Sequence, residues 1–161
     1  MTIAEKEFLK ESNAIEGVYG QDALSQAYHA LDYLKSKLVM DVDVVLHTHK
    51  ILMLHQTHLA PNEKGYFRRV PIWIGGRKVE PDMIFEKVKA WCRTMNKDPW
   101  TDIGPVGLHI MYENIHPFVD GNGRTGRMFL NWQMLKYHRP IMVIKSCERH
   151  KYYEWFKSAK K

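Results

Sequence analysis

Apolar residues recur at the three- to four-residue spacing of an amphipathic helix along most of this chain. Thr2 and Glu5 have the spacing of a capping box, so they predict that a helix begins here and covers residues 3–16. Similar patterns predict further helices near residues 21–37, 42–58, 82–92, 106–115, 125–135 and 150–160. Asp41 and Asp82 are the expected N-caps of the helices that follow them.

The helical pattern is interrupted in two places. Between residues 70 and 79, β-branched residues flank the pair Gly75 and Gly76, which predicts a β-hairpin. Pro99 and Pro105 are expected to bracket a loop before the next helix. We find no repeats, low-complexity segments or linkers, so we expect a single, mainly helical domain with a small hairpin over residues 1–161.

Composition adds limits to this picture. A chain of 161 residues with 45% apolar residues is long enough to bury a sizeable core. Cys92 and Cys147 match no metal-binding spacing and are expected to be reduced thiols. The first residues, MTIAEKEFLKESN, lack the pattern of a secretion signal, and no segment approaches the roughly 20 apolar residues that span a bilayer. We therefore expect a soluble, cytoplasmic protein without a membrane partner.

The formal net charge is +6, from 24 basic and 18 acidic residues. A positive net charge favours polyanionic partners. A nucleic-acid interface and a nucleotide site both need positive charge, so the net charge does not distinguish them. The basic residues are scattered, and the sequence has no recognition helix or base-stacking motif. A non-catalytic nucleic-acid-binding module is therefore only the alternative from a different functional class.

The segment HPFVDGNGRTGR, residues 116–127, concentrates the candidate chemistry. It is a glycine-rich turn that leads into a helix N-terminus, where free N–H groups and the helix dipole bind anions. Arg124 and Arg127 project from nearly the same side of the first helical turn and can bind phosphate oxygens. Asp120 offers an oxygen ligand for Mg2+, and His116 can accept a proton at neutral pH. Together these residues predict nucleotidyl or phosphoryl transfer.

Three other interpretations compete. Gly121, Gly123 and Gly126 have the spacing of a dinucleotide fingerprint, but the polar, proline-broken MYENIHPFVD before them is no buried strand. A structural turn with solvated arginines leaves the interleaved His, Asp and Asn unexplained. Four histidines in the third predicted helix resemble a metal cluster. His47 and His49 would face different ways on that helix, so surface or core-edge positions are favoured over a zinc site.

Residues 116–127 resemble, at every specified position, the signature of Fic domain proteins, H-P-F-x-[DE]-G-N-G-R-x-x-R. The resemblance extends to the helix containing LHIMYENIHPF, to a hairpin after GYFRR and to a YY pair near the C-terminus. It implies a helical fold and transfer of AMP from ATP to a Ser, Thr or Tyr hydroxyl of a target protein, with release of pyrophosphate. Residues 66–80 are similar to the target-binding flap of the family.

The same resemblance implies a role for each motif residue. His116 is the expected general base and Asp120 the expected Mg2+ ligand. Phe118 is expected to anchor the loop in the core, where its apolar ring would lie in any case. The expected phosphate-binding residues are Gly121, Asn122, Gly123, Arg124 and Arg127. Of these, Arg127 is expected to lie nearest the γ-phosphate. The expected flap contacts to the target are Ile72, Trp73 and Ile74, and the expected nucleobase contacts are Tyr152 and Tyr153.

A second motif, SNAIEG, resembles the inhibitory motif [ST]xxxE[GN] of the family. Ser12 and Glu16 share a helix face, and Gly17 suits a left-handed helix end. A capping box would need an acid three residues after Ser12, where an isoleucine stands, so capping does not account for Glu16. An ordinary exposed glutamate remains an alternative. The resemblance implies that Glu16 pairs with Arg127 in place of the γ-phosphate, which makes residues 1–17 an inhibitory helix.

Two alternatives stay open within the enzyme class. In the Doc branch a Lys replaces the second motif glycine, and those proteins act as kinases with a reversed nucleotide; Gly123 argues against this. Removal of AMP from a modified target is the other alternative, in which Glu16 would orient a water. Many family members carry an Ala-Asn pair near the C-terminus, whereas here Ala159 is followed by Lys160, which leaves base selectivity open. The sequence does not decide whether the protein forms a homo-oligomer.

Overall fold

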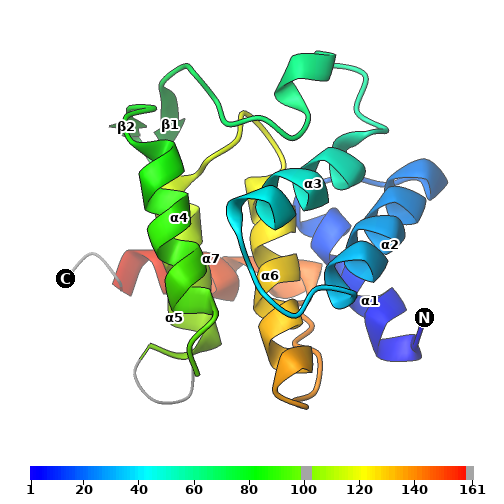
Figure 1. Ribbon diagram of the computed structural model, residues 1–161. Coiled ribbons are helices and arrows are strands. Elements are labelled where there is room, and N and C mark those ends of the chain that lie inside the picture. Colours follow the sequence, from blue (N-terminus) through cyan, green and yellow to red (C-terminus); the bar gives the residue numbers. More distant parts are fainter. Residues whose placement is uncertain (99–102, 159–161) are drawn as a thin grey trace.

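The computed structural model describes residues 1–98 and 103–158 of the chain. This part of the chain forms seven α-helices and one hairpin, which lies at an edge of the molecule (Figure 1). The helices are α1 (Ile3–Ile15), α2 (Gln21–Lys35), α3 (Val42–Met53), α4 (Ile84–Met95), α5 (Gly104–Ile115), α6 (Asn122–Lys136) and α7 (Arg149–Ser158). The short elements are the 3-10 turns η1 (Pro61–Glu63) and η2 (Ser146–Glu148) and the strands β1 (Ile72–Ile74) and β2 (Arg77–Val79). The prediction of a mainly helical fold with a hairpin is confirmed.

Helix α6 lies at the centre, with α1, α2 and α3 on one side and α4 and α5 on the other (Figure 1). Almost every residue of α6 up to Met134 is buried. The hydrophobic core draws residues from helices on both sides, for example Leu9, Leu52, Val88 and Phe129. The N-terminus of α6, which carries the glycine-rich motif, is therefore fixed to the centre of the core.

Two of the predicted helix caps are confirmed. Thr2 and Glu5 form the reciprocal capping box, with Thr2 Oγ1 accepting from Glu5 N at 3.1 Å and Glu5 Oε2 accepting from Thr2 N at 2.6 Å. Asp41 Oδ1 accepts from Val44 N at 2.8 Å and caps α3. At the other end of α1, Gly17 has a left-handed φ of +67°, as expected. The helix itself ends one residue earlier than predicted, at Ile15.

The predicted cap of α4 was wrong, and α5 begins two residues before its predicted start. Asp82 does not cap α4; Met83 takes the N-cap position with a left-handed φ of 57° and no side-chain cap. Pro105, the expected end of the loop, lies in the first turn of α5, where a helix needs no N–H from that residue. Pro99, the other end of the predicted loop, lies outside the described residues.

Three helix ends also differ from the prediction. Helix α2 ends at Lys35 rather than residue 37, and α3 ends at Met53 rather than residue 58. After Met53 the backbone bonds tighten, with Leu54 N donating to Ile51 O and Gln56 N donating to Met53 O. Helix α6 begins at Asn122, three residues before the predicted start, because the glycine-rich turn is itself helical. Its first bond runs from Thr125 N to Gly121 O at 3.0 Å.

The hairpin is present but its strands are shorter than residues 70–79 suggested. Strands β1 and β2 pair antiparallel, and Ile74 lies opposite Arg77. Gly75 and Gly76 both have positive φ, 53° and 80°. A two-residue hairpin turn with positive φ at both positions matches the right-handed twist of the strands that it joins. Trp73 points away from the neighbouring isoleucines and is 71% exposed.

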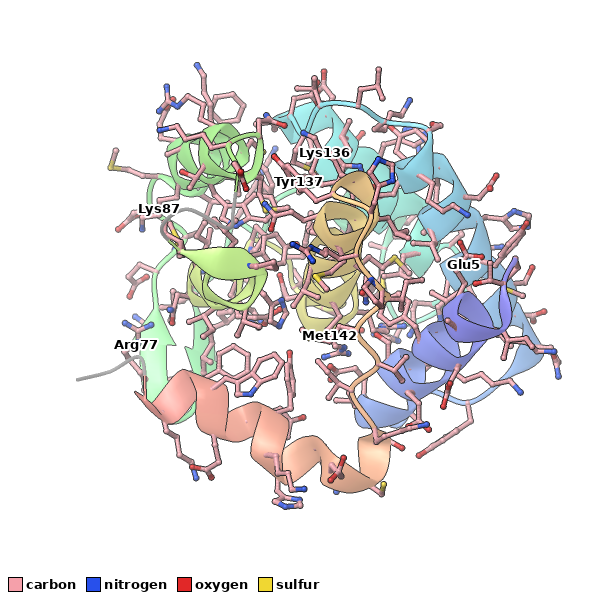
Figure 2. The ribbon with its side chains drawn as sticks, turned by 90° about the horizontal axis from the view of Figure 1, so that it is seen from below. Glu5, Arg77, Lys87, Lys136, Tyr137 and Met142 are labelled. Carbon is pink, nitrogen blue, oxygen red and sulfur yellow. The ribbon has the colours of Figure 1, made fainter. Side chains whose placement is uncertain are left out.

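Helix α7 runs along the lower edge of the view in Figure 2, from η2 beside α1 to the hairpin. Its path brings the C-terminal end of the described chain next to the hairpin that carries Arg77. None of the described helices combines the length and the apolar character that a bilayer crossing requires.

Candidate active site

The motif loop joins the end of α5 to the start of α6, and its own side chains hold it in shape. Phe118 N donates to Asn122 Oδ1 and Asn122 Nδ2 donates to Phe118 O, both at 2.9 Å. The Phe118 ring is fully buried and stacks on His49 with 3.6 Å between ring centroids. Phe118 thus anchors the loop as expected. The Asn122 side chain shapes the loop, so it offers a phosphate only its backbone N–H.

His116 stands at the C-terminal end of α5 with a left-handed φ of 48°. Its Nδ1 lies 3.3 Å from the backbone carbonyl of Glu113, which favours a proton on Nδ1 and leaves Nε2 free. Burial lowers the pKa of His116, with nearby Arg68 acting in the same direction. The imidazole is therefore neutral at physiological pH, as a general base must be.

Arg124 is 1% exposed, and two of its donors have no partner. Its Nη2 lies 3.6 Å from Asp120 Oδ2 and 3.3 Å from Met53 Sδ, while Nε and Nη1 make no hydrogen bond. Leaving buried charged donors unpaired is costly. An anion such as a phosphate, bound at the N-terminus of α6, would satisfy them.

Asp120 lies at the mouth of the same site, with 41% of its side chain exposed. Its Oδ1 accepts from Gly121 N at 2.6 Å, and its Oδ2 lies 3.2 Å from His58 Nε2. Among the described residues, no three His, Cys, Asp or Glu side chains gather into a metal cage. A single carboxylate beside unpaired arginine donors still fits Mg2+, which binds through one or two carboxylates together with substrate phosphates and waters.

Arg127 is held by two other segments of the chain, α1 with its C-cap and α7. Its Nη2 donates to Glu16 Oε1 at 2.7 Å and to the Ser12 carbonyl at 2.9 Å, and its Nε donates to Ser12 Oγ at 3.0 Å. Its Nη1 donates to the Tyr152 hydroxyl at 3.1 Å. The contact between Glu16 and Arg127 that the resemblance implies is therefore present. Its inhibitory role stays a prediction.

Gly123 allows Glu16 to reach this position. A Cβ added at Gly123 would lie 2.4 Å from Glu16 Oε1 and 2.9 Å from Arg127 Nη1, both closer than real contacts permit. The Glu16 carboxylate thus lies against the backbone of the motif itself. A lysine at this position, as in the Doc branch, would overlap with the Glu16 carboxylate.

A cavity of about 470 Å³ opens beside these groups. It is lined by Glu16 from α1, by His116 and Gly123 from the motif, by the hairpin and by α7. Ile74 lines the cavity, as do both predicted nucleobase contacts, Tyr152 and Tyr153; Ile72 and Trp73 do not. Predicted site residues from four separate segments thus line one cavity, namely Glu16, Ile74, His116, Gly123, Tyr152 and Tyr153. The other predicted phosphate- and metal-binding residues of the motif are not part of its lining.

Sequence reasoning missed two residues on α5 that face this cavity or its wall. Glu113 lies one helical turn before His116, with its Oε2 3.6 Å from His116 Nδ1. Burial raises the pKa of Glu113 to about 8, while Arg127 acts against the shift. Both groups are neutral at pH 7, so this contact is not an ion pair. His109, one heptad before His116, lies 2.9 Å from the Tyr152 hydroxyl through Nε2, and burial lowers its pKa to about 3.

Sequence reasoning also undervalued two histidines. His49 is fully buried; its Nδ1 accepts from Gly65 N at 2.9 Å, so its Nε2 carries the proton and donates to Asp120 O, also at 2.9 Å. His58 reaches the carboxylate of the same Asp120. Both side chains therefore help to hold the motif loop. Only their long-range contacts distinguish them from ordinary helix histidines.

A comparison with known proteins supports the resemblance. The model of the Fic/DOC family matches residues 39–134, more than half of the 161 residues. The chain belongs to the Fic/DOC family. The match includes the hairpin and the motif loop but begins after α1, so it does not cover the predicted inhibitory helix.

Curated relatives of this Fic/DOC chain include the proteins named "Protein adenylyltransferase Fic" from Drosophila yakuba and Drosophila melanogaster. Each is 32% identical over 142 residues, which cover 81% of this chain and 28% of the relative. The chain thus spans little more than a quarter of the length of these relatives.

Solved structures support the Fic fold. Fic-1 from C. elegans matches with a TM-score of 0.82 at 22% identity, over 99% of this chain and 56% of that one. A Fic domain containing signaling protein from Bacteroides thetaiotaomicron matches with a TM-score of 0.76 at 18% identity, over 93% and 69%. At such identities the likeness concerns the fold alone.

Proposed function

We propose that this Fic/DOC domain transfers AMP from ATP to a Ser, Thr or Tyr hydroxyl of a protein target. The observation that carries the proposal is the buried Arg124 guanidinium, whose Nε and Nη1 lack partners beside Asp120 at the start of α6. Donors in this state suit the phosphates of a nucleotide. The names of the curated relatives, which are protein adenylyltransferases, support the same activity.

In the proposed reaction, His116 Nε2 takes the proton of the acceptor hydroxyl while its oxygen attacks the α-phosphorus. A new oxygen–phosphorus bond forms on the target as the bond to the bridging oxygen breaks. Pyrophosphate leaves with the electron pair of that bond. The neutral state of His116 and the backbone carbonyl of Glu113 at its Nδ1 suit this role.

The phosphates would lie at the N-terminus of α6, where backbone N–H groups and Arg124 provide positive charge. Asp120 would hold Mg2+, which neutralises charge on the departing pyrophosphate when bound. Tyr152 and Tyr153, which line the cavity, would contact the nucleobase. The hairpin would bind the target by adding a strand at its edge, with Ile74 facing the reacting residue.

We further propose that Glu16 restrains this activity. Its carboxylate occupies a donor of Arg127, the residue expected nearest the γ-phosphate, and it lies against Gly123. ATP would have to displace it to bind productively.

The free, exposed Cys147 suits a reducing, cytoplasmic setting.

Labelled ATP tests the proposed activity. The protein is incubated with Mg2+ and with ATP labelled at either the α- or the γ-phosphate, and the label on protein is measured. We expect the α-label alone to become protein-bound. Transfer of the γ-label would instead establish phosphotransfer with a reversed nucleotide. Loss of α-label from a pre-modified protein, without any transfer, would establish removal of AMP.

A further inference from the structure

Arg68, in the segment between η1 and β1, is a buried cation outside the motif and is 3% exposed. Its guanidinium donates to four backbone carbonyls. Nε reaches His116 O at 2.8 Å, and Nη1 reaches Val70 O at 2.7 Å. At the C-terminal end of β2, Nη1 donates to Val79 O at 3.1 Å and Nη2 donates to Glu80 O at 3.2 Å.

These four acceptors belong to two segments that the proposed reaction must bring together. Val70 precedes β1 and Val79 ends β2, so both ends of the hairpin converge on one guanidinium. The fourth acceptor is the carbonyl of His116 itself. The Arg68 backbone adds a bond from its N to Pro117 O at 2.9 Å.

The His116 backbone needs such support. Its φ of 48° lies in the left-handed region, which costs a residue other than glycine on the order of 1 kcal/mol or more. A strained conformation persists only where its surroundings hold it. Arg68 supplies a charge-assisted bond to the carbonyl at this position and a backbone bond to the next one.

The contacts also require arginine rather than any cation. Among the described residues, no carboxylate lies within ion-pair distance of Arg68, so carbonyl oxygens accept its hydrogen bonds, and the nearby carboxylate of Glu80 adds a Coulombic attraction. The planar guanidinium directs N–H groups along several fixed directions at once. A lysine ammonium would present its donors from a single atom and could not reach both the hairpin and His116.

We propose that Arg68 is a positioning residue that fixes the hairpin, and the target strand it binds, relative to His116. This inference rests on the proposed function. The hairpin decides where the acceptor hydroxyl lies, and the His116 backbone decides where the general base lies. A displacement of about 1 Å between reacting groups can lower a rate about 100-fold. One buried side chain that bonds both segments therefore controls this distance.

The test compares Arg68→Lys and Arg68→Gln with the matched control Arg93→Lys, which changes an exposed arginine of α4. Each variant is made in the wild-type and Glu16→Gly backgrounds and given α-labelled ATP. Two products are measured: AMP on protein, which requires the hairpin and His116 together, and free AMP from attack by water, which requires no hairpin. The proposal predicts that the ratio of protein-bound to free AMP falls about 10-fold or more in both Arg68 variants. Arg93→Lys should leave the ratio unchanged.

A purely structural role would lower the folded fraction and reduce both products equally, so an unchanged ratio would overturn the proposal. Hydrogen exchange provides a reading that does not depend on activity. In Arg68→Lys, amides of residues 72–79 and of residues 116–118 should lose protection together, while the core of α6 keeps its protection. Loss in only one of the two segments would also overturn the proposal. Absence of α-label from the Arg93→Lys products, with the expected exchange pattern in Arg68→Lys, would instead count against the proposed function and leave the link itself supported.

Discussion

Removal of the Glu16 carboxylate should raise the activity of the domain. Glu16 Oε1 accepts from Arg127 Nη2 at 2.7 Å and lies where a Cβ at Gly123 would clash with it. Arg127 therefore has one donor occupied that a γ-phosphate would otherwise engage. Replacing Glu16, which stands just after the last residue of α1, with glycine frees that donor without interrupting the helix.

The size of the effect follows from burial. Exposed ion pairs contribute about 0–1 kcal/mol, whereas removing one partner of a buried pair costs about 3–5 kcal/mol. The Glu16 side chain is 34% exposed and that of Arg127 is 2% exposed, so the pair lies between these classes. Ser12 and Tyr152 continue to accept hydrogen bonds from Arg127 after the Glu16 carboxylate is removed. The free-energy change should therefore lie nearer to the value for exposed pairs than to the value for buried pairs. A difference of about 1–2 kcal/mol corresponds to a rise of about 5- to 30-fold.

The assay compares auto-modification by wild type, Glu16→Gly and Glu16→Gln under matched ATP and Mg2+. Gln keeps the volume of the side chain and loses its charge. If Glu16→Gln gains nearly as much activity as Glu16→Gly, the charge of Glu16 is responsible for the inhibition. If only Glu16→Gly gains activity, the volume of the side chain is responsible. Glu7→Gln is the matched control, since Glu7 pairs with Lys145 on the exposed side of the same helix.

Two results would refute the reasoning. One is unchanged activity in Glu16→Gly with the fold intact by circular dichroism. The other is an equal gain in Arg127→Ala, because that variant removes the proposed phosphate ligand together with the partner of Glu16. Lower activity in Glu16→Gly, combined with loss of AMP removal from a modified protein, would assign Glu16 to the removal reaction.

Three further predictions concern the same cavity. His116→Ala should lower transfer about 100- to 10,000-fold with ATP affinity unchanged, because a general base acts on the hydroxyl; near-normal turnover would remove His116 from the mechanism. Ile74→Pro removes a backbone donor from β1 and should impair transfer to protein while calorimetric titration shows normal ATP binding; loss of both would indicate unfolding. Glu113→Gln should stabilise the fold increasingly as the pH rises from 5 to 8. Burial raises the pKa of Glu113 from 4.5 to about 8, so the stability from its neutral form is complete below pH 4.5 and is lost as the pH rises through 8. Melting temperatures of mutant and wild type that keep a constant difference over this range would contradict that account.

Local sequence was sufficient for several features. The helical period, the Thr2 capping box and the Gly75–Gly76 turn depend on contacts within a few residues, and the structure confirms all three. The motif at residues 116–127 could also be recognised from the sequence, because a glycine-rich turn before a helix has anion-binding chemistry wherever it lies in a fold. Helix ends were less predictable. The start of α6 at Asn122 places two glycines in the first helical turns, which local propensity disfavours and burial in the core overrides.

The residues that complete the site were decided by tertiary structure. Arg68 is an ordinary basic residue in the sequence, and it becomes a link only because the chain returns to place His116, 48 positions later, against it. His49 meets Asp120 across 71 positions, and Ser12 meets Arg127 across 115. Glu113 acquires its raised pKa from burial beside α6 and α7, which no local pattern records. The sequence by itself thus determined the helices and the chemistry of the motif, because these depend on neighbours along the chain. Tertiary structure alone decided the charge states, the support of the loop and the contacts of Arg127 with Ser12 and Tyr152, because these depend on which distant segments exclude water from the same place.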